Sequence, residues 1–97
     1  MEQYHAEMLA VSLAGHDKGT CYVVLGWEDG FFLLSDGKSK PLERPKKKNQ
    51  KHVQLIRHLP HAIAEKMNRI SQDADVRGVL KLYSQRGAAP ENREGSE

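Results

Sequence analysis

Apolar and polar residues alternate in the first half of the chain with the spacing of short β-strands. Leu9, Val11 and Leu13 would face one side of a strand, and the later runs are rich in aromatic and β-branched residues. Asp-Gly pairs at 29–30 and 36–37 are turn signals, because glycine accepts a positive φ. The pattern predicts strands over residues 8–13, 21–27, 31–35 and 52–56, and a short edge strand, limited by two prolines, over residues 38–44.

After residue 58 the spacing becomes helical. Pro60 can take the first helical position, and Ser71 or Asp73 can cap a second helix. Apolar residues recur at intervals of three and four in two stripes, Ile63/Met67/Ile70 and Val76/Val79/Leu80/Tyr83. The pattern predicts two amphipathic helices that pack on the β-rich part or on each other. Residues 87–97 contain only two apolar residues, both alanine, and we expect a disordered tail there.

The fold class that follows is mainly β with C-terminal helices. Several short strands joined by tight turns suggest a small barrel over residues 1–58, followed by a helical extension over residues 59–86. A chain of 97 residues is too short for a doubly wound nucleotide-binding enzyme. No apolar stretch approaches the length of a membrane span, and the N-terminus lacks a signal core. We therefore expect a cytoplasmic protein without membrane partners.

Charge is distributed very unevenly along the chain. Residues 1–37 hold one basic and six acidic residues, whereas residues 38–58 hold eight basic residues and one acidic residue. The central run Lys46-Lys47-Lys48 is expected to be an exposed basic loop, within a basic segment over residues 38–51. A solvated surface does not need this concentration of charge, so the pattern favours a polyanionic partner.

The residues of this region resemble a known motif. The spacing of Val11, Gly15, Asp17, Lys18, Gly19, Val23 and Val24 resembles the KOW motif, which joins two strands of an SH3-like barrel through a glycine-containing loop. The segments 35–38, 41–49 and 51–54 look like those of small bacterial KOW-domain RNA-binding proteins. These proteins are similar to KOW-containing large-subunit ribosomal proteins of archaea and eukaryotes. The resemblance covers about residues 9–54; it departs at Ala6-Glu7, where the family pattern has a glycine, and at His16, where it has an arginine.

The resemblance implies a small SH3-like β-barrel that binds structured RNA, most plausibly ribosomal RNA, with ribosomal proteins as further partners. The two glycines of the motif have two possible roles. They are turn residues and nothing more, or they also let a phosphate approach the backbone. The basic side chains would neutralise phosphates, and replacing Lys46, Lys47 and Lys48 by glutamine should then weaken binding sharply. The candidate RNA-binding residues are Lys18, Gly19, Lys38, Lys40, Arg44, Lys46, Lys47, Lys48 and Lys51.

Aromatic residues leave alternatives open. Trp27 lies beside a turn, where it can pack in the core or at the rim of the barrel, or stack on a base. Phe31 and Phe32 point to opposite faces of one strand, so one is expected in the barrel core. The other can pack under the helices or form a contact surface.

Other classes of function find little support in the sequence. Cys21 begins an apolar run and is expected to be a small core residue in a reducing compartment. His58 and His61 lack an evident third ligand, so no metal site is predicted, and no cofactor or small-molecule substrate is expected. No catalytic motif is present, so an enzyme is not expected. The competing hypothesis is a protein-interaction module that recruits a transcription or translation complex, because the two helices lie outside the resemblance.

Overall fold

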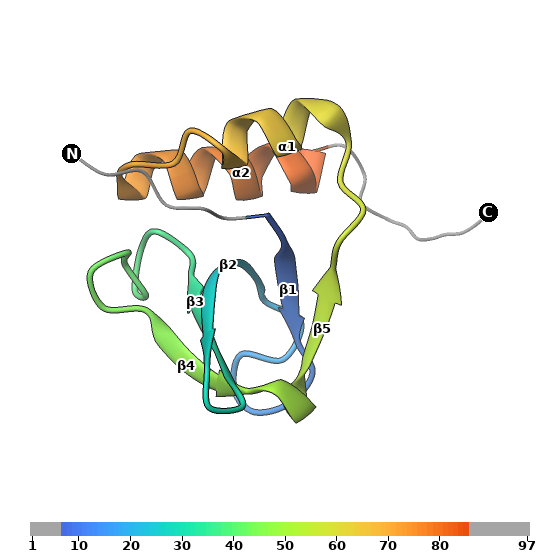
Figure 1. Ribbon diagram of the computed structural model, residues 1–97, viewed down its shortest axis with the longest axis vertical. Helices are drawn as coiled ribbons and strands as arrows, with labels where there is room; N and C mark the ends of the chain where they lie inside the picture. Colours follow the sequence, from blue (N-terminus) through green and yellow to red (C-terminus); the bar gives the residue numbers. More distant parts are fainter. Residues whose placement is uncertain (1–6, 86–97) are drawn as a thin grey trace.

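A computed structural model describes residues 7–85 of the chain. Within them, five antiparallel strands form one sheet with the order β4-β3-β2-β1-β5, and two helices follow (Figure 1). The strands are β1 (Leu9–Ser12), β2 (Cys21–Glu28), β3 (Phe31–Ser35), β4 (Lys46–Asn49) and β5 (Val53–Ile56). A 3₁₀ helix, η1 (Gln50–His52), links β4 to β5, and the α-helices are α1 (His61–Met67) and α2 (Asp73–Gln85). The prediction of a β-rich part with two C-terminal helices is confirmed at this level.

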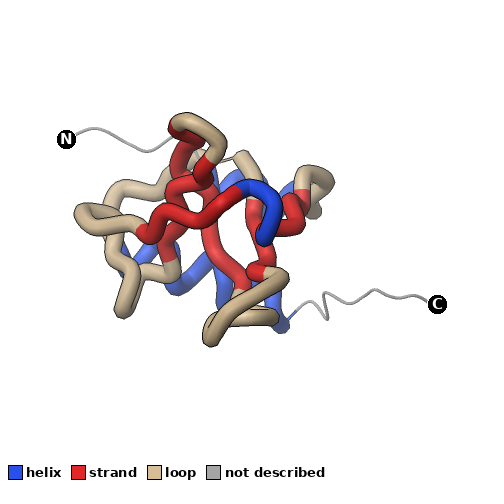
Figure 2. The backbone as a smooth tube through the Cα atoms, turned by 90° about the horizontal axis from the view of Figure 1, so that it is seen from below, coloured by secondary structure: helices blue, strands red, loops and turns tan. Residues whose placement is uncertain are grey.

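The sheet is strongly curved. A register shift between Val24 and Gly26 in β2 marks a β-bulge, which increases the local twist and bend of a strand. The β2–β3 hairpin turns at Asp29 and Gly30, whose φ angles of 50° and 85° are those of a tight hairpin turn. Seen from below, the strands wind around one another and most of the helical part lies behind them (Figure 2). As a result, β4 and the β1–β2 loop lie close to one another although they are distant in sequence.

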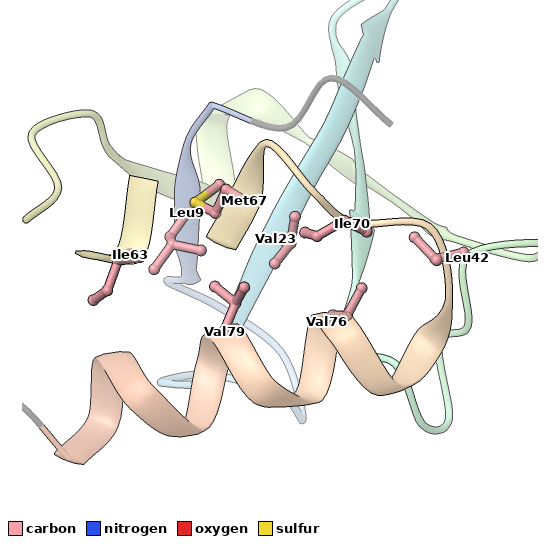
Figure 3. Close-up of a cluster of buried hydrophobic side chains, with 8 residues drawn as sticks. All are labelled: Leu9, Val23, Leu42, Ile63, Met67, Ile70, Val76 and Val79. Carbon is pink, nitrogen blue, oxygen red and sulfur yellow. The ribbon is translucent and has the colours of Figure 1, made fainter. Parts of the chain in front are cut away.

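Both faces of the central strands are covered. One side of β1 and β2 packs against the helices, where Met67 and Ile70 are fully buried (Figure 3). This cluster consists of Leu9, Val23, Leu42, Ile63, Met67, Ile70, Val76 and Val79. Fully burying one such side chain stabilises the fold by roughly 1.5–3 kcal/mol. The helical stripes predicted from the sequence therefore pack on the sheet.

The concave face of the sheet holds a second cluster. Because neighbouring strand residues point to opposite faces, Ala10 and Val24 lie here while Leu9 and Val23 face the helices. The cluster consists of Ala10, Tyr22, Val24, Leu34 and Val53, with Met8, Phe32 and Leu55 packed against it. Of the two neighbouring phenylalanines, Phe32 is thus the core residue, and Phe31 stays 37% exposed at the surface.

Two sequence predictions about the basic segment are wrong. Residues 38–44 form a turn-rich loop, because the Asp36 carboxylate accepts the backbone N–H groups of Lys38 and Lys40 at 2.8 and 2.9 Å. Residues 46–49, expected to be a loop, instead form the edge strand β4 paired with β3. Lysines suit such an edge, since they discourage pairing with another chain.

The helices begin close to the predicted positions. Pro60 is the N-cap of α1 and not its first helical residue, so the helix begins one residue later than expected. Just before α2 the Asp75 carboxylate accepts the backbone N–H groups of Ser71 and Gln72. The hydroxyl of Ser71 donates to Asp75, and the carboxylate of Asp73 accepts the N–H of Leu42, so these two side chains make other contacts than the predicted cap. The disordered tail predicted for residues 87–97 lies outside the described residues. No helix within residues 7–85 is long and apolar enough to cross a membrane.

Candidate nucleic-acid interface

Asp17, in the loop between β1 and β2, is the centre of a polar network. Its Oδ1 accepts hydrogen bonds from Ser12 Oγ at 2.8 Å and from Lys48 Nζ at 3.1 Å. Its Oδ2 accepts them from Tyr22 Oη at 2.7 Å and from Lys46 Nζ at 3.0 Å. Strands β1, β2 and β4 therefore meet at one carboxylate, which connects the edge of the sheet to the loop.

The network fixes the protonation state of its members. Burial alone would raise the pKa of Asp17, but the hydrogen bonds from Tyr22, Lys46, Ser12 and Lys48 outweigh it and hold the pKa well below its usual range. Burial, together with the hydrogen bond to Asp17 and the negative charge, raises the pKa of Tyr22. At neutral pH Asp17 is thus ionised and Tyr22 remains a hydrogen-bond donor.

The three lysines of β4 are already engaged within the protein. The side chains of Lys46 and Lys48 are only 29% and 11% exposed, and both pair with Asp17. Lys48 Nζ also donates to the carbonyl of Ala14 at 2.9 Å. Lys47 points to the opposite face, where it pairs with Glu28 at 3.2 Å in an exposed ion pair. The main role of Lys46 and Lys48 is therefore to stabilise the fold. The exposed ion pair between Lys47 and Glu28 can open at little cost in free energy.

The glycine-containing loop brings two further candidates to the surface. Gly15 and Gly19 both have positive φ angles, as the turn between β1 and β2 requires. Lys18 and Gly19 are exposed, and Lys18 forms no ion pair with residues 7–85. Lys18 follows Asp17 directly, so a cation with no ion-pair partner among residues 7–85 lies next to the network that holds Lys46 and Lys48.

Three more candidates lie in the β3–β4 loop, apart from the Asp17 network. Lys38 and Arg44 are exposed, and Lys40 is half-buried. The loop is fastened to α2, since Asp73 Oδ1 accepts the Leu42 backbone N–H at 2.8 Å. The structure divides the nine candidates into three groups: Lys18, Gly19, Lys46 and Lys48 around the Asp17 network, Lys38, Lys40 and Arg44 in the loop fastened to α2, and Lys47 and Lys51 in β4 and η1.

Exposed aromatic residues lie where the β2–β3 hairpin meets the end of β4. Trp27 is 58% exposed, and its indole Nε1 donates to Gln50 Oε1 at 3.1 Å. Phe31 pairs with Asn49 across the β3–β4 ladder. The exposed Lys51 follows Gln50 directly in η1. We call Trp27, Phe31, Lys47, Gln50 and Lys51 the hairpin edge.

Sequence reasoning missed several residues that shape these surfaces. Asp17 is only a motif position in the sequence, and no sequence signal places it beside Lys46 and Lys48, which lie 29 and 31 positions further along the chain. No sequence pattern identifies Gln50 as a site residue, because only folding brings its side chain to Trp27. Cys21, expected to be a core residue, is half-buried against the helices, and burial raises the pKa of its thiol to about 11.

Metal-ligating side chains do not gather in the described part of the chain. Within residues 7–85 no group of three or more histidine, cysteine, aspartate or glutamate side chains is placed to hold a metal ion. His61 Nε2 lies 3.5 Å from Glu65 Oε2, one helical turn further along α1.

Comparison of the sequence with protein-family models and with curated proteins found no match.

Proposed function

We propose that the protein binds RNA through the hairpin edge and the neighbouring β1–β2 loop, in a ribosome-associated setting. The observation that carries the proposal is the exposed indole of Trp27, which donates to Gln50. Lys51, which is exposed and forms no ion pair within residues 7–85, directly follows Gln50 in η1. The ligand is a structured RNA that presents unpaired bases. The resemblance to KOW-domain proteins supports ribosomal RNA as the ligand.

The strand order supports an SH3-like barrel of the KOW type as the framework. β1 pairs with both β2 and β5, and a 3₁₀ helix precedes the last strand. The bulge in β2 and the contacts of β4 with the β1–β2 loop curl the sheet toward closure. In this framework the loop with Gly15, Lys18 and Gly19 is the KOW loop.

The exposure of Trp27 is explained by a ligand that covers its ring. Large aromatic side chains usually bury most of their surface, whereas Trp27 leaves more than half of its own in solvent. Its hydrogen bond to Gln50 orients the ring, so less side-chain entropy is lost when a base stacks on it. Stacking on an aromatic ring is worth about 1–3 kcal/mol per base in single-stranded nucleic-acid complexes. Phe31 offers a second ring at the same hairpin, on the opposite face of β3 from Phe32, the cross-strand partner of Trp27.

Cations beside the rings supply the complementary phosphate contacts. Lys51 and Lys18 are exposed and form no ion pair within residues 7–85. Lys47 becomes available when a phosphate replaces Glu28 as its partner, since both side chains of that pair are more than half exposed. The ammonium groups of Lys46 and Lys48 both face the single carboxylate of Asp17, which leaves one net positive charge. This charge attracts phosphate without a direct contact.

Binding assays with paired variants test the proposal. Replacing Trp27 by alanine should weaken binding to an RNA hairpin with an unpaired loop at least about fivefold, given the value of one stacked base. Replacing Lys51 by glutamine should also weaken binding, because it removes a phosphate contact. Lys66→Gln, an exposed position on α1, removes the same charge elsewhere and should leave affinity unchanged. Equal affinities for all three variants and the wild type would refute this interface.

The same variants separate RNA binding from protein recruitment. The two helices and the exposed rings could also serve a protein partner, as a protein-interaction module would require. Partners pulled down from a lysate should then persist after nuclease treatment and disappear in Trp27→Ala. Loss of every partner on nuclease treatment supports RNA instead.

A further inference from the structure

A basic cleft lies between the β3–β4 loop and α2, away from the hairpin edge. Its volume is about 510 Å³, and its lining includes three cations, Lys38, Arg77 and Lys81, together with Thr20 and the carboxylate of Asp36. The volume is within the range of about 300–1,000 Å³ that is usual for ligand sites. The cleft joins a cation of the basic segment to two cations of the helical extension.

The cleft is built rigidly on one side. Arg77 Nη1 donates to the carbonyl of Gly37 at 2.6 Å, which fixes the guanidinium at the loop. A Cβ atom at Gly37 would lie 2.6 Å from the Asp73 carbonyl oxygen, so loop and helix touch backbone to backbone. Arg77 and Lys81 are one helical turn apart and share a side of α2.

The charges of the cleft are not balanced within the described chain. Lys38, Arg77 and Lys81 are all exposed and form no ion pair with residues 7–85. The one lining carboxylate, Asp36, is occupied by the backbone N–H groups of Lys38 and Lys40 and by Ser39 Oγ. Three cations around one engaged carboxylate leave a surplus of positive charge, which an anion would neutralise.

From this geometry we propose that the cleft is a phosphate-binding subsite that takes a backbone phosphate of the bound RNA; this rests on the proposed function. Arg77 would contribute the donors that Gly37 leaves free, and the two lysines would add charge from the rim. Thr20, at one end of the β1–β2 loop, lines the cleft, and the N–H of Leu13, at the other end, donates to the carbonyl of His52 next to Lys51 at 2.8 Å, so the loop connects the subsite to the hairpin edge. An RNA strand that follows this loop would reach both.

Salt dependence of RNA binding tests the subsite. The double variant Lys38→Gln/Lys81→Gln should bind RNA at least tenfold more weakly and flatten the slope of log K against log salt by about 0.7, the value of the one phosphate contact that the cleft supplies. The matched control Lys66→Gln/Arg69→Gln removes two exposed cations outside the cleft. It should keep the parental slope. Equal slopes for the two double variants would overturn the subsite, and thermal unfolding checks that both are folded.

A second arm with inorganic pyrophosphate separates this inference from the proposed function. Pyrophosphate should shift the amide resonances of residues 36–40 and 77–81 in the wild type, and the shifts should be lost in Lys38→Gln/Lys81→Gln. RNA binding that depends on Trp27 but leaves these resonances unmoved would overturn the subsite alone. Pyrophosphate shifts without any RNA binding would refute the proposed function and the RNA backbone as the source of the phosphate.

Discussion

Lys48 Nζ lies 3.1 Å from Asp17 Oδ1, so an edge-strand lysine is bound to a loop aspartate 31 positions earlier in the chain. The ammonium group is also held by the Ala14 carbonyl, and its side chain is only 11% exposed. This contact divides the lysine-rich segment into residues that hold the fold and residues that remain available to a ligand.

Removing the carboxylate should destabilise the fold strongly. Asp17→Asn leaves Lys46 and Lys48 without their counter-charge, and breaking a mostly buried pair costs about 3 kcal/mol or more. Urea denaturation should show this loss. Asp29→Asn removes an exposed turn carboxylate, where asparagine also tolerates positive φ, and should change stability by less than about 0.5 kcal/mol. Equal stability of the two variants would contradict the role of the network.

Stability should depend on pH through the same carboxyl group. Because the pKa of Asp17 is lower in the folded protein, the unfolded chain binds the proton more readily. The contribution of Asp17 is complete above its unfolded value near 4 and is lost as the pH falls below it. The stability difference between wild type and Asp17→Asn should therefore shrink from pH 6 toward pH 2. A difference that is constant over this interval would show that the charge of Asp17 does not stabilise the fold.

The lysines of β4 and η1 should separate stability from binding. Lys48→Gln should lower the unfolding temperature, whereas Lys51→Gln should leave it unchanged and weaken RNA binding. Replacing all three lysines of β4 mixes these effects, so the weaker binding expected from the sequence would not by itself identify a contact surface. Calorimetry and RNA titration on the two single variants check the separation. It fails if Lys51→Gln lowers the unfolding temperature as much as Lys48→Gln.

The contact between the β3–β4 loop and α2 should be sensitive at Gly37. Gly37 and Gly19 both have positive φ, but only at Gly37 would a Cβ atom meet backbone, at 2.6 Å; at Gly19 no atom lies within 4 Å. Gly19→Ala should thus show the conformational cost alone, about 1–2 kcal/mol. Gly37→Ala should cost clearly more, because the loop must also move away from α2. Equal losses in urea denaturation would mean that the close approach adds nothing.

Much of the fold could be predicted from local pattern. The alternation in β1 and the Asp-Gly signal of the β2–β3 hairpin predicted the strands, and the stripe with Ile63 and Met67 predicted a buried helix face. The fourth strand was misplaced because lysine runs carry no strand signal of their own. Residues 46–49 are extended because β3 offers them a pairing edge, which is a tertiary effect.

The candidate site was less accessible to sequence reasoning than the fold. Charge density identified the basic segment, but Lys46 and Lys48 are paired with an acid from another loop, which the sequence could not place opposite them. The sequence pattern does not identify Arg77 as a site residue, because only the contact of the β3–β4 loop with α2 brings Arg77 close to Lys38. The surfaces depend on long-range contacts, whereas local pattern reports only on neighbours along the chain.

The intrinsic fluorescence of Trp27 tests the central claim most directly, because it is the one tryptophan of the chain. Titration with an RNA hairpin that has an unpaired loop should quench this fluorescence in a saturable way, and the midpoint should move to higher RNA concentration as salt is added. Two results would contradict binding of RNA at Trp27. One is RNA binding without a change in the fluorescence, and the other is no RNA binding at low salt.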